Sequence, residues 1–348
     1  MSTPKSSNRF MLILFVWFIA AGVIYVWFSG IVPMSTGMGL FVFQLLGFGM
    51  PCGVVLIRKR GKIREILPMQ RLDVKNILML TGMALAFVPM LMFIATVSQM
   101  FFTDIISEVV EEVNMEVSLL WALFFIGVVP SVFEELAFRG VIFSGYKDVP
   151  IIKAALVNAL FFGIIHMNMQ QFFFTAVAGF VWCFFVFYTR SIWAAVFAHF
   201  INNGTQVLFS FWVLGMDDYT IDGYAAYEGD LVAALIALGV IVAIGMVIFF
   251  VIYRRFKAHN IRRNAAFDEL MAEDAEPIVD EPDIFDEAPP TAKPRIITAS
   301  LCVVVALFAV FMLLIEFTPD EPAPSYQQDS YISARNSKAT SSAYHSYT

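Results

Sequence analysis

The chain has 348 residues, of which 59% are hydrophobic and 15% charged, and its formal net charge is −7 at pH 7. An ordinary soluble domain carries about 25% charged residues, so this composition excludes a soluble globule. It also excludes a porin-like barrel, whose strands would be about ten residues long and would alternate apolar with polar residues. The apolar runs are instead about twenty residues long, the length that a helix needs to cross a bilayer. We therefore predict an all-α, polytopic transmembrane helical bundle. Its expected partner is the lipid bilayer, and we expect it to bind no nucleic acid.

Nine apolar runs are candidate membrane spans. In chain order they cover residues 10–28, 39–57, 77–97, 117–143, 151–167, 172–188, 192–214, 231–253 and 296–317. The first run exceeds the 7–15 residues of a signal-peptide core, so we expect it to remain as a helix. The pattern predicts about eight core helices and one further C-terminal transmembrane helix.

Basic residues gather in every second connection between the runs. Seven Lys or Arg lie between Arg58 and Lys75, and seven more lie between Arg254 and Arg295. The alternate connections carry none, and the one from Asp104 to Glu116 holds five acidic residues. The positive-inside rule then places the N-terminus in the cytoplasm and the C-terminal tail outside. The short loops and the single long acidic linker of this chain favour a bacterial origin, so we expect an integral, multi-pass protein of a bacterial cell membrane.

The composition also divides the chain. Residues 1–253 are predicted to form the membrane core. Residues 254–295 are rich in acidic residues and proline, and such a segment cannot bury enough apolar surface to fold alone, so we expect a disordered cytoplasmic linker. Residues 296–317 form the last helix, and the Ser, Thr and Tyr-rich residues 318–348 are expected to be a disordered tail.

Two adjacent glutamates, Glu134 and Glu135, lie inside the fourth apolar run. A carboxylate in mid-membrane costs at least about 2.5–3.5 kcal/mol, so each needs a partner or a purpose. On a helix, Glu135 shares a face with Arg139 and can pair with it, whereas Glu134 points about 100° away. Pro130 removes a helical hydrogen bond just before them and frees backbone polar groups. The pattern therefore predicts a structural ion pair and one uncompensated acid, Glu134.

Two histidines lie in other apolar runs. His166 is in the fifth run, and His199 is in the seventh with Asn203 one helical turn later. Counted at 1.5 Å per residue from the nearest cytoplasmic basic residue, Glu134 and His166 lie about 20 Å deep and His199 about 14 Å deep. Three separate spans thus place ionisable groups at compatible depths, which permits one shared site.

This combination of residues fits more than one chemistry. Glu134 and an imidazole can activate water, while a second imidazole and an amide stabilise an oxyanion, as peptide-bond hydrolysis requires. Glu134, His166 and His199 can instead be the three ligands of a zinc ion, although the chain has no HExxH motif. Intramembrane Glu and His also build proton relays in transporters.

Three motifs resemble one known family. Residues 134–139 read EExxxR, residues 162–166 read FxxxH, and residues 199–203 read HxxxN. In this order and on successive helices, they resemble the CPBP intramembrane proteases, also called the Abi or type II CAAX prenyl protease family. The resemblance covers about residues 77–214 and leaves the first two spans, the linker, the last helix and the tail unaccounted for.

The resemblance implies roles for these residues. Glu134 would be the water-activating base with His166 as its partner, and His199 with Asn203 would bind the oxyanion. Three residues would support the site, namely Glu135, Arg139 and Phe162, the last by packing against the His166 imidazole. The implied activity is that of an intramembrane endopeptidase acting on membrane-associated or lipid-modified proteins or peptides. The family is often labelled metalloprotease, and a metal-free glutamate mechanism is also argued for it, so zinc dependence stays open here.

Two other functions remain open at this stage. One is a non-catalytic scaffold, for instance a bacteriocin-immunity protein that binds a membrane peptide. The other is a proton-coupled transporter. In relatives from eukaryotes the substrate is a prenylated protein cut at its CaaX tripeptide, whereas bacterial relatives act in bacteriocin processing, immunity or surface-protein anchoring.

Overall fold

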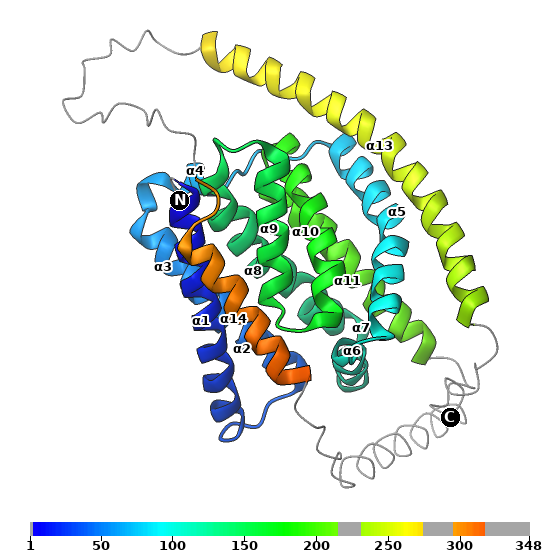
Figure 1. Cartoon of the computed structure of the whole chain (residues 1–348). Coiled ribbons are helices and arrows are strands. Elements are labelled where there is room, and N and C mark those ends of the chain that lie inside the picture. Colours follow the sequence, from blue (N-terminus) through cyan, green and yellow to red (C-terminus); the bar gives the residue numbers. More distant parts are fainter. Residues whose placement is uncertain (1–2, 215–230, 274–294, 317–348) are drawn as a thin grey trace, which may run out of the picture. The chain divides into compact units, whose positions relative to one another are not determined.

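A computed structural model describes residues 3–214, 231–273 and 295–316 (Figure 1). Within these residues every regular element is a helix, and a single isolated bridge pairs Met69 with Ser191. The predicted all-α class is therefore confirmed. The first compact unit ends at Phe308, and the described residues after it, 309–316, belong to a second unit and form the end of the last helix.

The helices up to the middle of the chain include three π-helices. They are α1 (Pro4–Ser29), α2 (Thr36–Gln44), the π-helix η1 (Leu45–Gly49), α3 (Met50–Arg58), η2 (Arg60–Lys62), α4 (Ile63–Ile66), α5 (Val74–Gln99), α6 (Ile105–Glu116), α7 (Leu119–Ala122), the π-helix η3 (Leu123–Val128), α8 (Val129–Glu135), the π-helix η4 (Leu136–Ile142) and η5 (Phe143–Tyr146). The later helices are α9 (Ile151–Ile165), α10 (Met169–Thr189), α11 (Ile192–Leu214), α13 (Leu231–Glu273) and α14 (Ala299–Glu316).

Each of the nine predicted runs is helical in the structure. Among the described residues, six helical segments are long and apolar enough to cross a membrane, and α9 and α14 are apolar but shorter. The six segments cover residues 4–29, 36–58, 74–99, 119–146, 169–189 and 233–269. The chain is thus an integral, multi-pass helical membrane protein, as its composition predicts.

The acidic connection after α5 is not a simple loop. Asp104 caps α6 by accepting hydrogen bonds from the backbone N–H groups of Ile106 and Ser107. The apolar side of α6 contributes Val110 and Val113 to a small core that also contains Val207 of α11. Four of the five acids therefore belong to an amphipathic helix packed on the bundle, and the fifth, Asp104, caps it.

The prediction of a disordered linker over residues 254–295 is wrong for residues 254–273. Helix α13 continues without a break to Glu273, about 20 residues beyond the end of its apolar run (Figure 1). The polar half is stabilised by contacts with the bundle, and the clearest is a reciprocal pair of side-chain amide bonds between buried Asn260 and buried Asn76 of α5. Composition alone does not reveal such partners. Residues 274–294 of the linker and the tail from residue 318 lie outside the described residues.

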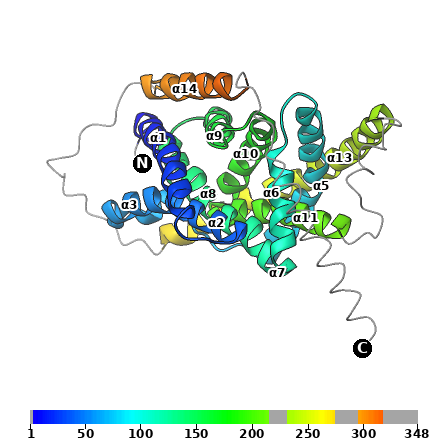
Figure 2. The ribbon, with the colours of Figure 1, turned by 90° about the horizontal axis from the view of Figure 1, so that it is seen from below.

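Helix α8 carries the two glutamates and lies inside the bundle, between α11 on one side and α2 with η1 on the other (Figure 2). A π-helix precedes it and another follows it, and single-turn π segments are frequent at functional sites. Pro130 is in the first turn of α8 and has no N–H to offer the Ile126 carbonyl four residues earlier. That carbonyl instead accepts a hydrogen bond from the Asn203 side chain at 3.0 Å. Pro130 therefore frees a backbone acceptor, as predicted, and this acceptor is the Ile126 carbonyl oxygen.

Candidate active site

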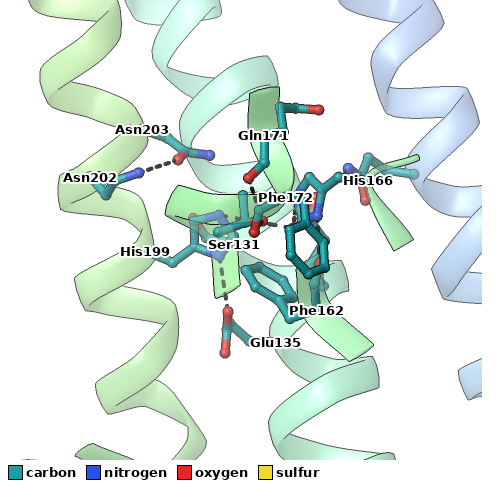
Figure 3. A network of polar contacts seen from close by, with 12 residues as sticks. Ser131, Glu135, Phe162, His166, Gln171, Phe172, His199, Asn202 and Asn203 are labelled. Atoms are coloured by element: carbon teal, nitrogen blue, oxygen red, sulfur yellow. Dashed lines mark hydrogen bonds and ion pairs between the residues drawn. The ribbon is translucent and has the colours of Figure 1, made fainter. Parts of the chain in front are cut away.

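Glu135 is bonded to two buried partners, and Figure 3 shows one of them, His199. Its Oε1 lies 3.0 Å from Nη1 of Arg139, one turn later, and both side chains are fully buried. The same oxygen lies 3.0 Å from Nδ1 of His199 on α11. The ion pair with Arg139 is as predicted from spacing, and the bond to His199 was not anticipated. Glu135 thus joins two helices through one oxygen atom.

Aromatic rings enclose the Arg139 guanidinium. Its Cζ lies 4.3 Å from the ring centre of Phe162 and 5.3 Å from that of Trp182, which are cation–π distances. Gly179 of α10 makes room for this arrangement, because a Cβ at that position would lie 3.0 Å from both Arg139 Nη2 and Phe162 Cδ1. Hydrogen bonding on one side and ring faces on the other hold the charge in an apolar interior.

His166 lies in the short turn between α9 and α10, directly after the last residue of α9. The next residue, Met167, has a positive φ of 50°, an uncommon conformation for a residue with a side chain. The imidazole Nδ1 lies 2.6 Å from the Phe162 carbonyl oxygen, which can only accept, so Nδ1 carries the hydrogen and Nε2 holds a lone pair. The Phe162 ring packs edge-on against the imidazole with centroids 5.0 Å apart, the contact predicted from their spacing.

The two carboxylate oxygens of Glu134 have different contacts. Its Oε1 accepts a hydrogen bond from Nε2 of Gln44 on α2 at 2.8 Å. Its Oε2 is buried without a direct hydrogen-bond partner among the described residues, and it lies 3.8 Å from Nε2 of His166 and 4.0 Å from Nε2 of His199. The side chains are 8%, 15% and 5% exposed, in the order Glu134, His166 and His199. The structure thus brings the three ionisable groups, from three separate runs, around one carboxylate oxygen.

The His199 ring is fixed from two directions. Trp182 stacks on it with centroids 4.5 Å apart and an angle of 25° between the planes. The Glu135 carboxylate accepts from Nδ1, so the Nε2 atom is the one presented to Glu134. Asn203, one turn along α11, donates to the Ile126 carbonyl and accepts from Asn202 at 3.0 Å (Figure 3). Asn203 is therefore near the site, and one of its two amide hydrogens is already engaged.

The two imidazoles and the Glu134 carboxylate match only some features of a zinc site. Both imidazoles present Nε2 while Nδ1 is bonded to a carbonyl or a carboxylate, which is the usual outer-shell arrangement of metal-binding histidines. The separations of 3.8 and 4.0 Å exceed the roughly 3.3 Å between neighbouring ligand atoms around tetrahedral zinc. Within the part of the chain that the structure describes, no three His, Cys, Asp or Glu side chains are close enough to hold an ion. The arrangement does not fit zinc as it stands.

Two residues of the site, Gln44 and Trp182, were not predicted from the sequence. Gln44 is the single polar side chain with hydrogen-bonding capacity near the middle of the run 39–57, and an isolated glutamine in an apolar run was an available signal. Trp182 carried no such signal, because an aromatic residue in an apolar helix is ordinary. Its contact with His199 depends on how α10 and α11 pack.

The fold and the cluster together define a class, a polytopic helical membrane protein that buries one carboxylate between two imidazoles. The family model described as "Type II CAAX prenyl endopeptidase Rce1-like" matches residues 116–205, which contain all three motifs. The resemblance of this region to the CPBP intramembrane proteases, read from the motifs, is therefore confirmed.

The chain is also similar to a curated protein, the "Putative membrane peptidase YdiL" of Bacillus subtilis (strain 168). The two are 30% identical over 82 residues, which are 23% of this chain and 34% of that protein. The chain therefore spans about a third of the length of this relative. No solved structure matches the chain.

Proposed function

We propose that this protein is an intramembrane endopeptidase that hydrolyses peptide bonds of membrane-associated or lipid-modified substrates. One observation carries the proposal: Oε2 of Glu134 faces Nε2 of His166 and Nε2 of His199 at 3.8 and 4.0 Å, in a buried site. The matches to a CAAX prenyl endopeptidase family and to a membrane peptidase support the same reaction class.

Hydrogen-bond capacity assigns a role to each group. Glu134 Oε2 and the lone pair of His166 Nε2 are both acceptors, so one water molecule can donate a hydrogen to each and keep an oxygen lone pair for attack. The water oxygen bonds to the peptide carbonyl carbon while its proton passes to Glu134. When the C–N bond breaks, Glu134 returns this proton to the leaving amine. Atoms and charge then balance without a further reactant.

We assign stabilisation of the oxyanion to His199 and Asn203. His199 faces the same oxygen of Glu134 through Nε2, and we assign it to the oxyanion. The Glu135 carboxylate accepts from Nδ1 and so fixes the orientation of the His199 ring. Asn203 contributes the amide hydrogen that is not bonded to Ile126. Preorganised donors of this kind typically supply a factor of about 10²–10³ each.

Glu134→Gln tests the proposal directly. The glutamine keeps the shape and can still bond to Gln44, but it cannot take a proton from water, so turnover should fall by at least about 10³-fold while the variant folds normally. The assay uses purified protein in liposomes and a quenched fluorogenic peptide with a farnesylated cysteine three residues from its C-terminus. A non-prenylated transmembrane peptide is assayed in parallel to test the substrate class.

Glu112→Gln is the matched control, because it makes the same change on the exposed side of α6 and should leave turnover within about twofold. Cleavage by Glu134→Gln at the wild-type rate would contradict the proposal, and so would the lack of cleavage of either peptide by folded wild-type protein. Cleavage that survives a strong chelator supports the metal-free glutamate route, whereas loss that zinc restores would replace it with a metal-dependent one.

A further inference from the structure

Gln44 contacts the proposed base from outside the region that matches the family. It is the last residue of α2, and its Nε2 donates to Oε1 of Glu134 at 2.8 Å across 90 positions of sequence. The carboxylate can only accept, so the amide nitrogen, and not the amide oxygen, faces it. The matched residues 116–205 contain Glu134 but not Gln44.

The bond decides which oxygen of Glu134 faces the imidazoles. The terminal torsion of a glutamate is broad and turns easily, so a carboxylate held at no point would present either oxygen in varying directions. With Oε1 bonded to Gln44, Oε2 is the oxygen directed at His166 and His199. A misplacement of about 1 Å at a reacting group can cost about 10²-fold in rate.

A neutral donor suits this purpose. Arg139, the cation nearest in sequence, pairs with Glu135 and is enclosed by two aromatic rings. Gln44 instead orients Glu134 through an uncharged amide. The two adjacent carboxylates are therefore held by different means, one by a guanidinium and one by an amide.

The local backbone is built to bring Gln44 to α8. The π-helix η1 begins at the next residue, and it lies against both α8 and α1. Gly49 at the end of η1 permits the close approach, because a Cβ there would lie 2.8 Å from Cε1 of Phe133, the neighbour of Glu134. The amide Oε1 of Gln44 is also buried, so the amide group points into the protein interior.

From these contacts we infer that Gln44 is a positioning residue, which holds the Glu134 carboxylate so that one oxygen faces both imidazoles. The inference rests on the proposed function, since it concerns the same reaction. It adds α2 and η1, which the family match does not include, to the parts of the chain that turnover requires.

Gln44→Met tests the inference with the farnesylated and transmembrane peptides described above. It keeps the length of the side chain and removes the donor, so kcat should fall about 10–100-fold while KM stays within about twofold. Gln99→Met is the matched control, because Gln99 also donates to a carboxylate, that of Asp104, but on an exposed surface. Its kcat should be unchanged.

Two further variants separate positioning from a general packing role. Gln44→Asn keeps the amide but is one methylene too short, so it should lose turnover like Gln44→Met. Gln44→His carries a ring N–H at a similar reach and should recover kcat to within about fivefold of wild type. A kcat of Gln44→Met within twofold of wild type, a change in KM alone, or a Gln44→His variant as impaired as Gln44→Met would each overturn the inference. If Gln44→Met does not fold, Gln44→Asn replaces it with the same expected and contrary results.

A melting experiment distinguishes failure of this inference from failure of the proposed function. Melting temperatures of wild type, Gln44→Met, Glu134→Met and the double variant report the contact without any cleavage. The shift of the double variant should differ from the sum of the single shifts, and additive shifts would overturn the contact. Coupling without cleavage by wild type would refute the proposed reaction alone, whereas cleavage by wild type with unchanged kcat in Gln44→Met would refute only the role of Gln44.

Discussion

The adjacent carboxylates of α8 have different surroundings because of where their side chains point. Glu135 is fully buried and accepts from a guanidinium and an imidazole through one oxygen. Glu134 is 8% exposed, bonds to an uncharged amide, and turns its second oxygen toward two imidazoles. We therefore assign a structural role to Glu135, which is paired with a cation, and a catalytic role to Glu134, which is held by a neutral amide.

Arg139→Met should therefore damage folding. Removing one partner of a buried ion pair commonly costs about 3–5 kcal/mol, because the remaining charge stays buried without compensation. Here the remaining charge is Glu135, in a site where both side chains are fully buried. The free energy of unfolding, measured in mild detergent by denaturant titration, should fall by this amount. Glu134→Gln should change it by less than about 1 kcal/mol, and the reverse order of the two variants would invert the assigned roles.

Gly179→Ala should disturb the same pair by a different route. The added methyl would lie 3.0 Å from Arg139 Nη2 and from the Phe162 ring, both of which are confined by neighbours. Overpacking of this kind costs about 1–3 kcal/mol. Gly239→Ala is the matched control, because nothing lies within 4 Å of a Cβ there. Thermal melting should show a lower melting temperature for Gly179→Ala only, and equal melting temperatures would contradict the packing argument.

At the scale of elements, the polar half of α13 is an ordered part of the bundle. His259 Nε2 lies 2.9 Å and Arg263 Nε 3.8 Å from the carboxylate of Asp73, which caps α5. Further along, Arg190 forms two hydrogen bonds to Asp268, and Asn264 donates to the Tyr188 carbonyl. These contacts attach one long helix to the segments before α5 and after α10, both of which carry basic residues and are predicted to be cytoplasmic.

The Asp73 contacts predict a pH dependence for this attachment. Burial raises the pKa of the Asp73 carboxyl, but the Asn76 N–H, His259 and Arg263 outweigh it and bring the pKa below its ordinary value. A lowered folded-state pKa means that the stabilisation is fully present above the ordinary pKa near 4 and is lost as pH falls through the lower one.

Hydrogen exchange measures this effect. At pH 6, Asp73→Asn should exchange faster than wild type in residues 256–268, because the variant lacks the carboxylate that pairs with α13. As pH falls through the folded-state pKa of Asp73, the wild-type carboxyl becomes neutral and the difference should shrink. A difference that stays constant down to pH 2.5 would show that the charge of Asp73 is not what attaches the helix.

At the scale of the whole molecule, the alternation of connections with and without basic residues predicts how the chain crosses the membrane. Accessibility tags near Pro282 and near Ser330, both outside the described residues, should report opposite sides, the first cytoplasmic and the second external. The physical reason is that Lys and Arg are retained on the cytoplasmic side. Helix α14 between them has 18 residues, about 27 Å of helix, which is close to the bilayer core. Tags on the same side would remove the ninth crossing.

The sequence by itself determined the features that depend on local spacing and on hydropathy. The nine apolar runs became helices because a chain in lipid must satisfy its backbone hydrogen bonds within each segment. The pair of Glu135 and Arg139 and the packing of Phe162 on His166 followed from residues four apart on helices or helix ends. The compatible depths of Glu134, His166 and His199 only permitted a shared site, because depth limits the position along the membrane normal but not around it.

Only the tertiary structure decided the contacts made across helices. Gln44 on Glu134, His199 on Glu135 and Trp182 on His199 join residues far apart in sequence, and the packing of neighbouring helices selects such partners. The same reason explains the extra length of α13, since its polar half is helical where Asn76 and Asp73 meet it. Hydropathy records whether a side chain can leave water, whereas a hydrogen bond requires a partner at about 3 Å, and that distance exists only after the helices have packed.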